Sequence, residues 1–238
     1  MIRAVIRTVV LDIEGTTSSL SYVRDHLFPY SRQRLESWLS KPLPEVAEIA
    51  AEIRKRIGSP EASADELAEA LRGWIDDDVK EPALKSLQGL IWQHGYASGE
   101  LTSHVYDDVL PALTRWQEQG ATLYVFSSGS VLAQQDWFRH TGSGDLLHFF
   151  SGHFDTRNPG PKADPASYAS IASQTATEPA EILFCSDSEP ELDAARTAGW
   201  HTLGVQRADG FATAVHRHST VPSFDGVDLL ARPQETHA

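Results

Sequence analysis

The chain has 238 residues, enough for one large domain or for a domain that carries an insertion. Asp and Glu number 33 against 20 Lys and Arg, which gives a formal net charge of -13. This charge argues against nucleic acid or an anionic membrane as the main partner. Cys185 is the single cysteine, so a disulfide within the chain is excluded.

The first expected element is a short strand over residues 6–11. β-Branched and aliphatic residues dominate this run, which is typical of a strand buried on both faces. Arg3 and Arg7 interrupt the N-terminal apolar stretch, which lacks the long apolar region of a signal peptide or a membrane span. We therefore expect a cytoplasmic protein with no membrane partner. Asp12 and Glu14 follow the strand directly, flanking one apolar residue.

From about residue 25 to residue 96, apolar residues recur at helical spacing and no strand pattern occurs. A Pro-Leu-Pro segment that begins at Pro42 separates the first two expected helices. Ser63 and Glu66 match a capping box that would start the third helix, and Pro82 lies near the first turn of the fourth. The pattern predicts an all-helical insertion of roughly 80 residues.

After Glu100, expected helices and strands alternate, and the tail from Ala208 is expected to be irregular. Helices are expected over 109–116, after Ser130 through Phe138, over 164–174 and over 191–198, and strands over 121–126, 181–185 and 201–205. Such alternation predicts parallel pairing with right-handed crossovers. We therefore predict an α/β fold, with a Rossmann-like parallel sheet core over residues 1–22 and 102–238 and an inserted all-helical cap domain over residues 23–101.

Polar residues follow three of the expected strands. Asp12 and Glu14 follow the first strand, Ser127 and Ser128 follow the second, and Asp187 follows the third. Because the carboxyl ends of parallel strands share one edge of a sheet, these residues are expected to converge into one site. Three carboxylates there form a hard oxygen site of the kind that Mg²⁺ prefers.

Each of these residues also has a plainer interpretation. Asp187 precedes a helix and would serve as its cap, and the serines would form a cap and a tight turn. Lys162, on a Gly-Pro loop, would be a solvated surface residue. Taken together, however, the residues suit phosphoryl transfer through an aspartyl phosphate. In that hypothesis Asp12 attacks phosphorus, Glu14 acts as acid and base, and Ser127 and Lys162 stabilise the phosphate oxygens.

The motifs resemble those of the haloacid dehalogenase-like superfamily, and specifically the enolase-phosphatase family of methionine salvage. Most phosphatases of the superfamily carry Asp where Glu14 stands, and this departure narrows the resemblance to one branch of the superfamily. The segments that carry it are Asp12-Ile13-Glu14-Gly15-Thr16-Thr17, Leu27-Phe28-Pro29-Tyr30, Leu87-Gln88-Gly89 with Trp92, Ser127-Ser128-Gly129, Gly152-His153-Phe154-Asp155-Thr156, Lys162, and Ser186-Asp187 with Glu191.

The resemblance implies a bifunctional, Mg²⁺-dependent enzyme with one ion per subunit. It would enolise 2,3-diketo-5-methylthiopentyl-1-phosphate and then release phosphate, giving an acireductone. Asp12 and Glu14 would be the catalytic residues, and both would bind the metal together with Asp187. Ser127, Ser128 and Lys162 would bind the substrate phosphate. The small phosphorylated substrate would be the main partner of a cytoplasmic monomer that binds no nucleic acid and no membrane.

Several alternatives stay open at this point. The enolisation base is Glu14 or a cap residue such as Lys85, and Glu14 would bind metal through its side chain or its carbonyl oxygen. The chain would otherwise be a phosphatase of the same superfamily with another small phosphate monoester as substrate. A metal-independent dehalogenase and a non-catalytic binding protein with the same fold are two further readings.

Overall fold

A computed structural model describes residues 4–77, 79, 81–209 and 215–230. The chain forms two compact units. The α/β unit comprises residues Met1–Ser21 and Thr102–Ala238, and the helical unit comprises Tyr22–Leu101. Within the described residues, no helix is both long and apolar enough to cross a membrane.

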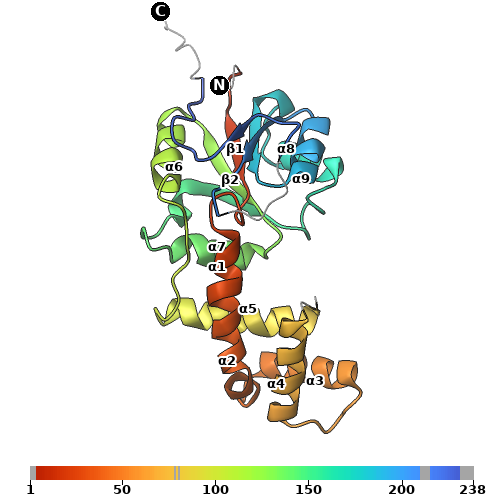
Figure 1. Cartoon of the computed structure of the whole chain (residues 1–238). Coiled ribbons are helices and arrows are strands. Elements are labelled where there is room, and N and C mark those ends of the chain that lie inside the picture. Colours follow the sequence, from red (N-terminus) through yellow and green to blue (C-terminus); the bar gives the residue numbers. More distant parts are fainter. Residues whose placement is uncertain (1–3, 78, 80, 210–214, 231–238) are drawn as a thin grey trace, which may run out of the picture. The chain divides into compact units, whose positions relative to one another are not determined.

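Six strands among the described residues of the α/β unit form one parallel sheet, in the order β3-β2-β1-β4-β5-β6 (Figure 1). The strands are β1 (Thr8–Leu11), β2 (Thr122–Phe126), β3 (Phe150–Phe154), β4 (Ile182–Ser186), β5 (His201–Val205) and β6 (Thr220–Val221). Among its described residues this unit has the α-helices α6 (Val109–Glu118), α7 (Val131–Arg139), α8 (Pro165–Gln174) and α9 (Glu189–Thr197), and the short 3-10 helices η2 (Leu147–Phe149) and η3 (Pro179–Glu181). The predicted α/β class with a parallel sheet is confirmed.

β1 lies between β2 and β4, and its register with both strands fixes where the polar residues fall. Leu11 pairs with Val125 on one side and with Cys185 on the other. The backbone N–H of Asp12 then donates to the Cys185 carbonyl oxygen over 3.0 Å. The carboxyl ends of the three central strands therefore lie side by side, as the sequence predicted.

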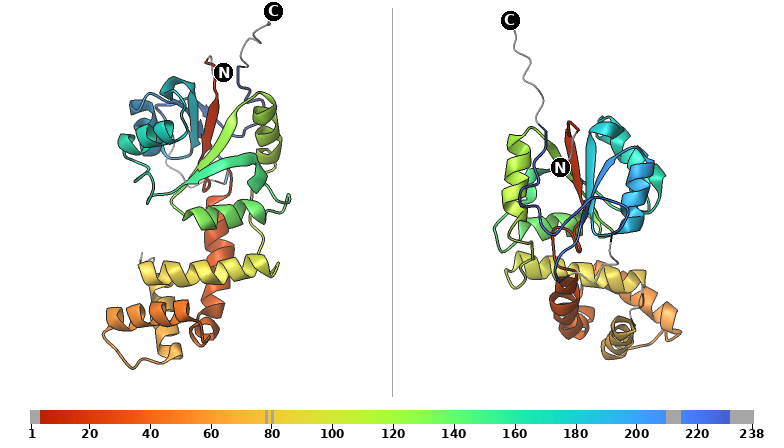
Figure 2. Two further views of the ribbon diagram at one scale, coloured as in Figure 1. Left: turned by 180° about the vertical axis from the view of Figure 1, so that it is seen from behind. Right: turned by 45° about the horizontal axis from the view of Figure 1, so that its top comes forward.

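Helices α8 and α9 cover one face of the sheet. Tyr168 of α8 and Leu192 of α9 are fully buried with Val10, Phe126 and Phe184 from the strands. The Tyr168 ring meets the Phe126 and Phe184 rings edge to face, at centroid distances of 5.6 and 5.3 Å. Helix α6 covers the opposite face (Figure 2). With both faces covered, β1 is entirely buried, which explains its continuous apolar sequence.

The helical unit is the predicted all-helical insertion. Its helices are η1 (a π-helix, Val23–Leu27), α2 (Phe28–Leu39), α3 (Pro44–Ile57), α4 (Ala64–Asp76) and α5 (Pro82–Ala97), and α1 (Leu20–Tyr22) leads into it. Pro44 and Pro82 occupy first-turn positions, where the missing N–H costs nothing. The capping box is present at α4: Ser63 Oγ accepts from the Glu66 amide, and the Glu66 carboxylate accepts from the Ser63 amide.

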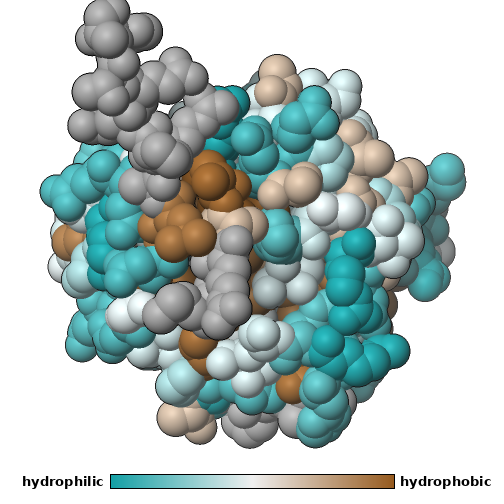
Figure 3. Space-filling model, turned by 90° about the horizontal axis from the view of Figure 1, so that it is seen from above, coloured by the Kyte–Doolittle hydropathy of each residue, from teal (hydrophilic) through white to brown (hydrophobic). Residues whose placement is uncertain are grey.

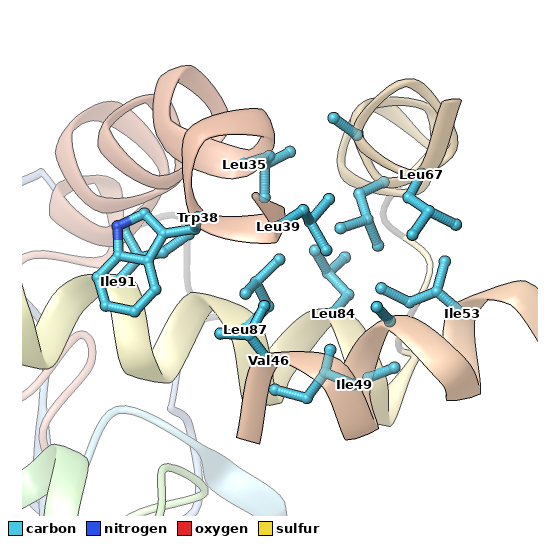
Figure 4. Close-up of a cluster of buried hydrophobic side chains, with 14 of the residues drawn as sticks. Leu35, Trp38, Leu39, Val46, Ile49, Ile53, Leu67, Leu84, Leu87 and Ile91 are labelled. Atoms are coloured by element: carbon cyan, nitrogen blue, oxygen red, sulfur yellow. The ribbon is translucent and has the colours of Figure 1, made fainter. Parts of the chain in front are cut away.

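Apolar side chains from α2 to α5 meet in one core in the helical unit (Figure 4). The residues labelled there are buried and come from all four helices: Leu35, Trp38 and Leu39 of α2, Val46, Ile49 and Ile53 of α3, Leu67 of α4, and Leu84, Leu87 and Ile91 of α5. The insertion thus buries its own hydrophobic core. This accounts for the helical periodicity in the sequence.

Two strands and one helix differ from the sequence-based expectation. β3 was not expected, because its sequence Phe-Ser-Gly-His-Phe contains Gly and no β-branched residue, and it lies at the sheet edge. β6 has two residues within the tail that was expected to be irregular. The π-helix η1 leaves no pattern in hydropathy. Trp92 Nε1 donates to the Leu27 carbonyl oxygen over 2.9 Å at its end.

Figure 3 shows the end of the α/β unit where the strands begin, with a small hydrophobic area among hydrophilic residues. A cavity there is lined by Val5, Ile6, Arg7, Thr8, Gln119, Gly120, Thr122, Thr177 and Leu230. Among these residues Arg7 alone is charged, and it pairs with Glu181 over 3.5 Å. The charged and nucleophilic side chains expected of an active site lie at the other end of the strands.

Candidate active site

One pocket at the carboxyl end of the sheet brings together the residues that the sequence singled out. It is lined by Asp12, Glu14, Leu20, Ser127, Ser128, Lys162, Asp187 and Glu191. The six residues predicted to be catalytic, phosphate-binding or metal-binding are all among them. They come from the ends of β1, β2 and β4 and from the loop before α8. Parallel strand order thus assembles a site from segments far apart in the sequence.

Asp12 is 5% exposed, and donors hold both of its carboxylate oxygens. Oδ1 accepts from the Ile13 amide over 2.8 Å and from Lys162 Nζ over 2.6 Å. Oδ2 accepts from Ser186 Oγ over 3.3 Å. These contacts fix the orientation of the carboxylate at the mouth of β1. A carboxylate that is oriented in advance is suited to nucleophilic attack.

Lys162 is 7% exposed, so the surface interpretation of this residue is wrong. Its Nζ pairs with Asp12 and also lies 2.7 Å from Glu191 Oε2. Burial by itself would lower the pKa of Lys162, but the charges of Asp12 and Glu191 outweigh that effect and raise the pKa. Lys162 is therefore a buried group whose ammonium form is favoured beside the Asp12 carboxylate.

For Asp187 and Glu191, burial and nearby negative charges favour the neutral form, so the pKa of each carboxyl group is raised. Burial, followed by the negative charges of Asp12 and Glu191, raises the pKa of Asp187 to about 7. Burial and the Asp12 charge also raise the pKa of Glu191, although Lys162 opposes the shift. The pocket thus crowds carboxylates together around a single ammonium group. Such a group of carboxylates is stabilised by a further cation.

The turn after β1 explains why Gly and Thr follow the acidic pair. Gly15 has φ of +75°, and a Cβ atom there would overlap the Asp187 carboxylate. Thr16 Oγ1 accepts from the Asp187 amide over 3.0 Å, and Thr17 Oγ1 donates to the Asp12 carbonyl oxygen over 3.0 Å. The turn therefore connects the ends of β1 and β4.

The serine loop after β2 is held by a glutamine that sequence reasoning did not single out. Gln134 of α7 is 1% exposed, and its Nε2 lies 2.7 Å from the Gly129 carbonyl oxygen and 2.8 Å from the Phe154 carbonyl oxygen. Ser130 Oγ caps α7 by accepting from the Ala133 amide. Ser127 and Ser128 thus lie on a loop fixed at the N-terminus of a helix, where an anion is stabilised.

The residues present fit a magnesium ion in their chemistry. The pocket offers hard carboxylate oxygens with excess negative charge. Burial and the neighbouring charges of Asp12 and Glu191 raise the pKa of Asp187, and a bound cation would offset both effects. In the part of the chain that the structure describes, no group of three His, Cys, Asp or Glu side chains is placed to hold a metal by itself. Glu14 is exposed and faces the pocket, so whether it uses its side chain or its carbonyl oxygen stays open.

The enolisation candidate Lys85 lies elsewhere in the chain. It is exposed on α5 in the helical unit. Its role stays a prediction. Glu191, in contrast, was noted only as part of a motif, and it lies within the pocket in direct contact with Lys162. Sequence reasoning could have identified Glu191 as a site residue from its place in the first turn of α9, four residues after Asp187.

Comparisons with known proteins agree with this site. The family model described as haloacid dehalogenase-like hydrolase matches residues 6–199. The chain is 49% identical to "Enolase-phosphatase E1" of Streptomyces avermitilis, over 94% of this chain and 95% of that protein. It is 47% identical to the protein of the same name from Erwinia tasmaniensis, over 94% and 97%.

Solved structures give the same result for the fold. The UTR4 protein of Saccharomyces cerevisiae superposes with a TM-score of 0.78 at 30% identity, covering 93% of this chain and 99% of that one. A HAD phosphatase from Thermococcus onnurineus shares the fold at 17% identity, with a TM-score of 0.60 over 93% and 96% of the two chains. The chain therefore belongs to the haloacid dehalogenase-like hydrolases, and within them to the family of proteins named enolase-phosphatase E1.

Proposed function

We propose that the chain converts 2,3-diketo-5-methylthiopentyl-1-phosphate into the acireductone of methionine salvage, by enolisation followed by phosphate release. The observation that carries the hydrolytic half is the buried pair of Asp12 and Lys162 at the end of β1, beside a serine loop suited to phosphate. The shared family with enolase-phosphatases carries the enolisation half. A monomeric enzyme of the cytoplasm stays our expectation.

In the hydrolytic half, Asp12 is the nucleophile. A carboxylate oxygen forms a bond to phosphorus while the bond from phosphorus to the substrate oxygen breaks, and Glu14 gives a proton to that oxygen. Glu14 then takes a proton from water, which attacks phosphorus and frees Asp12 and phosphate. Lys162 and the Ser127 hydroxyl, with Ser128, stabilise the phosphate oxygens throughout.

In the enolisation half, a proton leaves carbon 1 and a proton is added to the oxygen on carbon 2. Glu14 is one candidate base, because it is exposed and lines the pocket. Lys85 of the helical unit is the other candidate. The helical unit would be the cap that separates the reacting groups from water.

Magnesium would be held by Asp12, Asp187 and an oxygen of Glu14. When bound, it supplies positive charge that reduces the repulsion between the Asp12 carboxylate and the substrate phosphate. The carboxylate-rich lining of the pocket supports this assignment, because it needs a cation to be fully ionised at neutral pH.

A comparison of substrates tests the proposal. Phosphate release and enediol absorbance are followed with the diketo phosphate and with a set of sugar phosphates, each at the same concentration and with Mg²⁺. We expect both signals with the diketo phosphate and a kcat/KM far above that for any sugar phosphate. Phosphate release without enediol, or a preference for a sugar phosphate, would identify the enzyme as another phosphatase of the superfamily.

A further inference from the structure

Arg207 is a buried arginine behind the catalytic turn. It follows β5 and is 9% exposed. Its Nε donates to the Thr16 carbonyl oxygen over 2.9 Å. Its Nη1 lies 2.8 Å from each carboxylate oxygen of Asp108. One planar guanidinium group therefore connects the turn after β1 with the start of α6.

The surroundings of this guanidinium group hold it in place. Its carbon atom lies 4.2 Å from the centroid of the Tyr106 ring and 5.0 Å from that of Phe224. The Phe224 amide donates to Asp108 Oδ2 over 2.6 Å, so the acidic partner is fixed as well. Two rings and a hydrogen-bonded carboxylate thus define the position of the Arg207 side chain.

The contact with Thr16 leads on to the active site. The carbonyl oxygen of Thr16 is bound by Arg207, while its hydroxyl group accepts from the Asp187 amide. Thr16 is fully buried, so both groups need these partners. A continuous chain of hydrogen bonds therefore runs from Arg207 through Thr16 to the backbone of Asp187.

We propose that Arg207 is a positioning residue, which acts through Thr16 to fix Asp187 relative to Asp12. The proposal rests on the proposed function, because it takes Asp187 as a residue of the magnesium-binding site. The geometry of Arg207 suits this role better than lysine would. An ammonium group can pair with Asp108 but cannot present a second N–H to Thr16 in the same plane.

Two variants separate positioning from general stability. Arg207→Lys keeps the charge and removes the planar fork, while Thr16→Val removes the hydroxyl group at nearly constant shape. Arg217→Lys is the matched control, since Arg217 forms exposed ion pairs with Glu189 and Asp193 in the same unit. Thr16→Ser is the rescue variant, because it retains the hydroxyl group.

Two measurements are made on each full-length protein. The first is kcat and KM for phosphate release from the diketo phosphate. The second is the Mg²⁺ concentration at half of the maximal rise in melting temperature, without substrate. We expect Arg207→Lys and Thr16→Val to lower kcat about tenfold and to raise that Mg²⁺ concentration about tenfold, with KM little changed. Thr16→Ser and the control should resemble the wild type.

The outcomes distinguish a failure of the proposed function from a failure of the positioning role. If the wild type releases no phosphate from this substrate, the proposed function fails. If the wild type is active and both variants match Arg217→Lys in kcat and in the Mg²⁺ midpoint, the positioning role is wrong. If Arg207→Lys unfolds below the assay temperature, Thr16→Val is compared with Thr16→Ser instead. A loss of kcat and a raised Mg²⁺ midpoint in Thr16→Val alone support the positioning role, and equal values in the two variants refute it.

Discussion

Lys162 Nζ lies 2.6 Å from Asp12 Oδ1, in an ion pair buried between residues 150 positions apart. The same ammonium group lies 2.7 Å from Glu191 Oε2. One positive charge therefore balances the buried Asp12 carboxylate and the partly buried Glu191 carboxylate at the carboxyl end of the sheet. Because the removal of one partner leaves the other charge uncompensated in a buried place, this relationship makes the site sensitive to any change of charge.

Replacing Lys162 should destabilise the protein as well as inactivate it. Lys162→Met leaves the buried Asp12 and the partly buried Glu191 without a cation, so the free energy of unfolding should fall by about 3 kcal/mol. The double variant with Glu191→Gln removes one of the two charges and should recover part of that loss, without recovering activity. Urea unfolding and phosphate release measure the two effects. A double variant less stable than Lys162→Met would contradict this account of the charges.

Much of the fold could be predicted because its signals are local. The Ser63–Glu66 capping box, the first-turn Pro82 and the apolar run of β1 each follow from the chemistry of adjacent residues. β3 was missed because Gly152 and His153 interrupt its strand propensity, and its pairing with β2 is a tertiary effect.

The residues of the site also divide into those that could be predicted from the sequence and those that could not. Asp12, Ser127 and Asp187 could be predicted, because parallel strand order brings strand ends to one edge. The contacts of Gln134 with two carbonyl oxygens and of Arg207 with Thr16 could not, because they join segments whose distance in space does not follow from their spacing in the sequence. Periodicity cannot distinguish such buried polar residues from solvated ones.

The metal-free protein should become more stable when Asp187 loses its charge. The folded-state pKa of Asp187, about 7, lies above its ordinary value of 3.8. Its contribution to stability is therefore present below pH 3.8 and is lost as the pH rises to 7 and above. In EDTA at pH 8, Asp187→Asn should exceed the wild type in free energy of unfolding by about 2 kcal/mol.

The difference should shrink as the pH approaches 4, where the wild-type carboxyl group is protonated in both states. Added Mg²⁺ should stabilise the wild type and leave Asp187→Asn unchanged. Urea titrations at pH 4, 6 and 8 would show this. An Asp187→Asn protein that is less stable than the wild type in EDTA at pH 8 would show that the crowding of carboxylates is not as we describe it.

His153 should make the protein sensitive to acid. Burial lowers its pKa to about 4, and its Nε2 is buried without a hydrogen-bond partner in the structure. Between pH 6.5 and 4 the unfolded chain binds a proton that the folded chain excludes, so stability falls as the pH falls through this window. His153→Leu should therefore lose less stability than the wild type between pH 7 and pH 5, as measured by urea midpoints.

The exposed His148 provides the control for that experiment. The same substitution there should leave the pH dependence at its wild-type size. Equal pH dependence in wild type and His153→Leu would mean that this histidine is protonated without cost in the folded state.

Lys85 offers a test of the enolisation base. It is exposed on α5, so Lys85→Met should leave the fold intact. If Lys85 is the base, the variant should slow enediol formation while it cleaves a simple phosphate ester at the wild-type rate. The two rates are followed by absorbance and by phosphate release. Equal loss of both activities would exclude this role and favour Glu14.

The central claim is that Asp12 is the nucleophile of phosphate transfer, and the Asp12→Asn variant tests it most directly. Phosphate release from the diketo phosphate is measured with Mg²⁺ for the wild type, for Asp12→Asn and for the control Asp225→Asn, whose carboxylate is exposed. The account predicts a loss of at least about a thousandfold in kcat for Asp12→Asn and none for the control. Turnover by Asp12→Asn at the wild-type rate would contradict it.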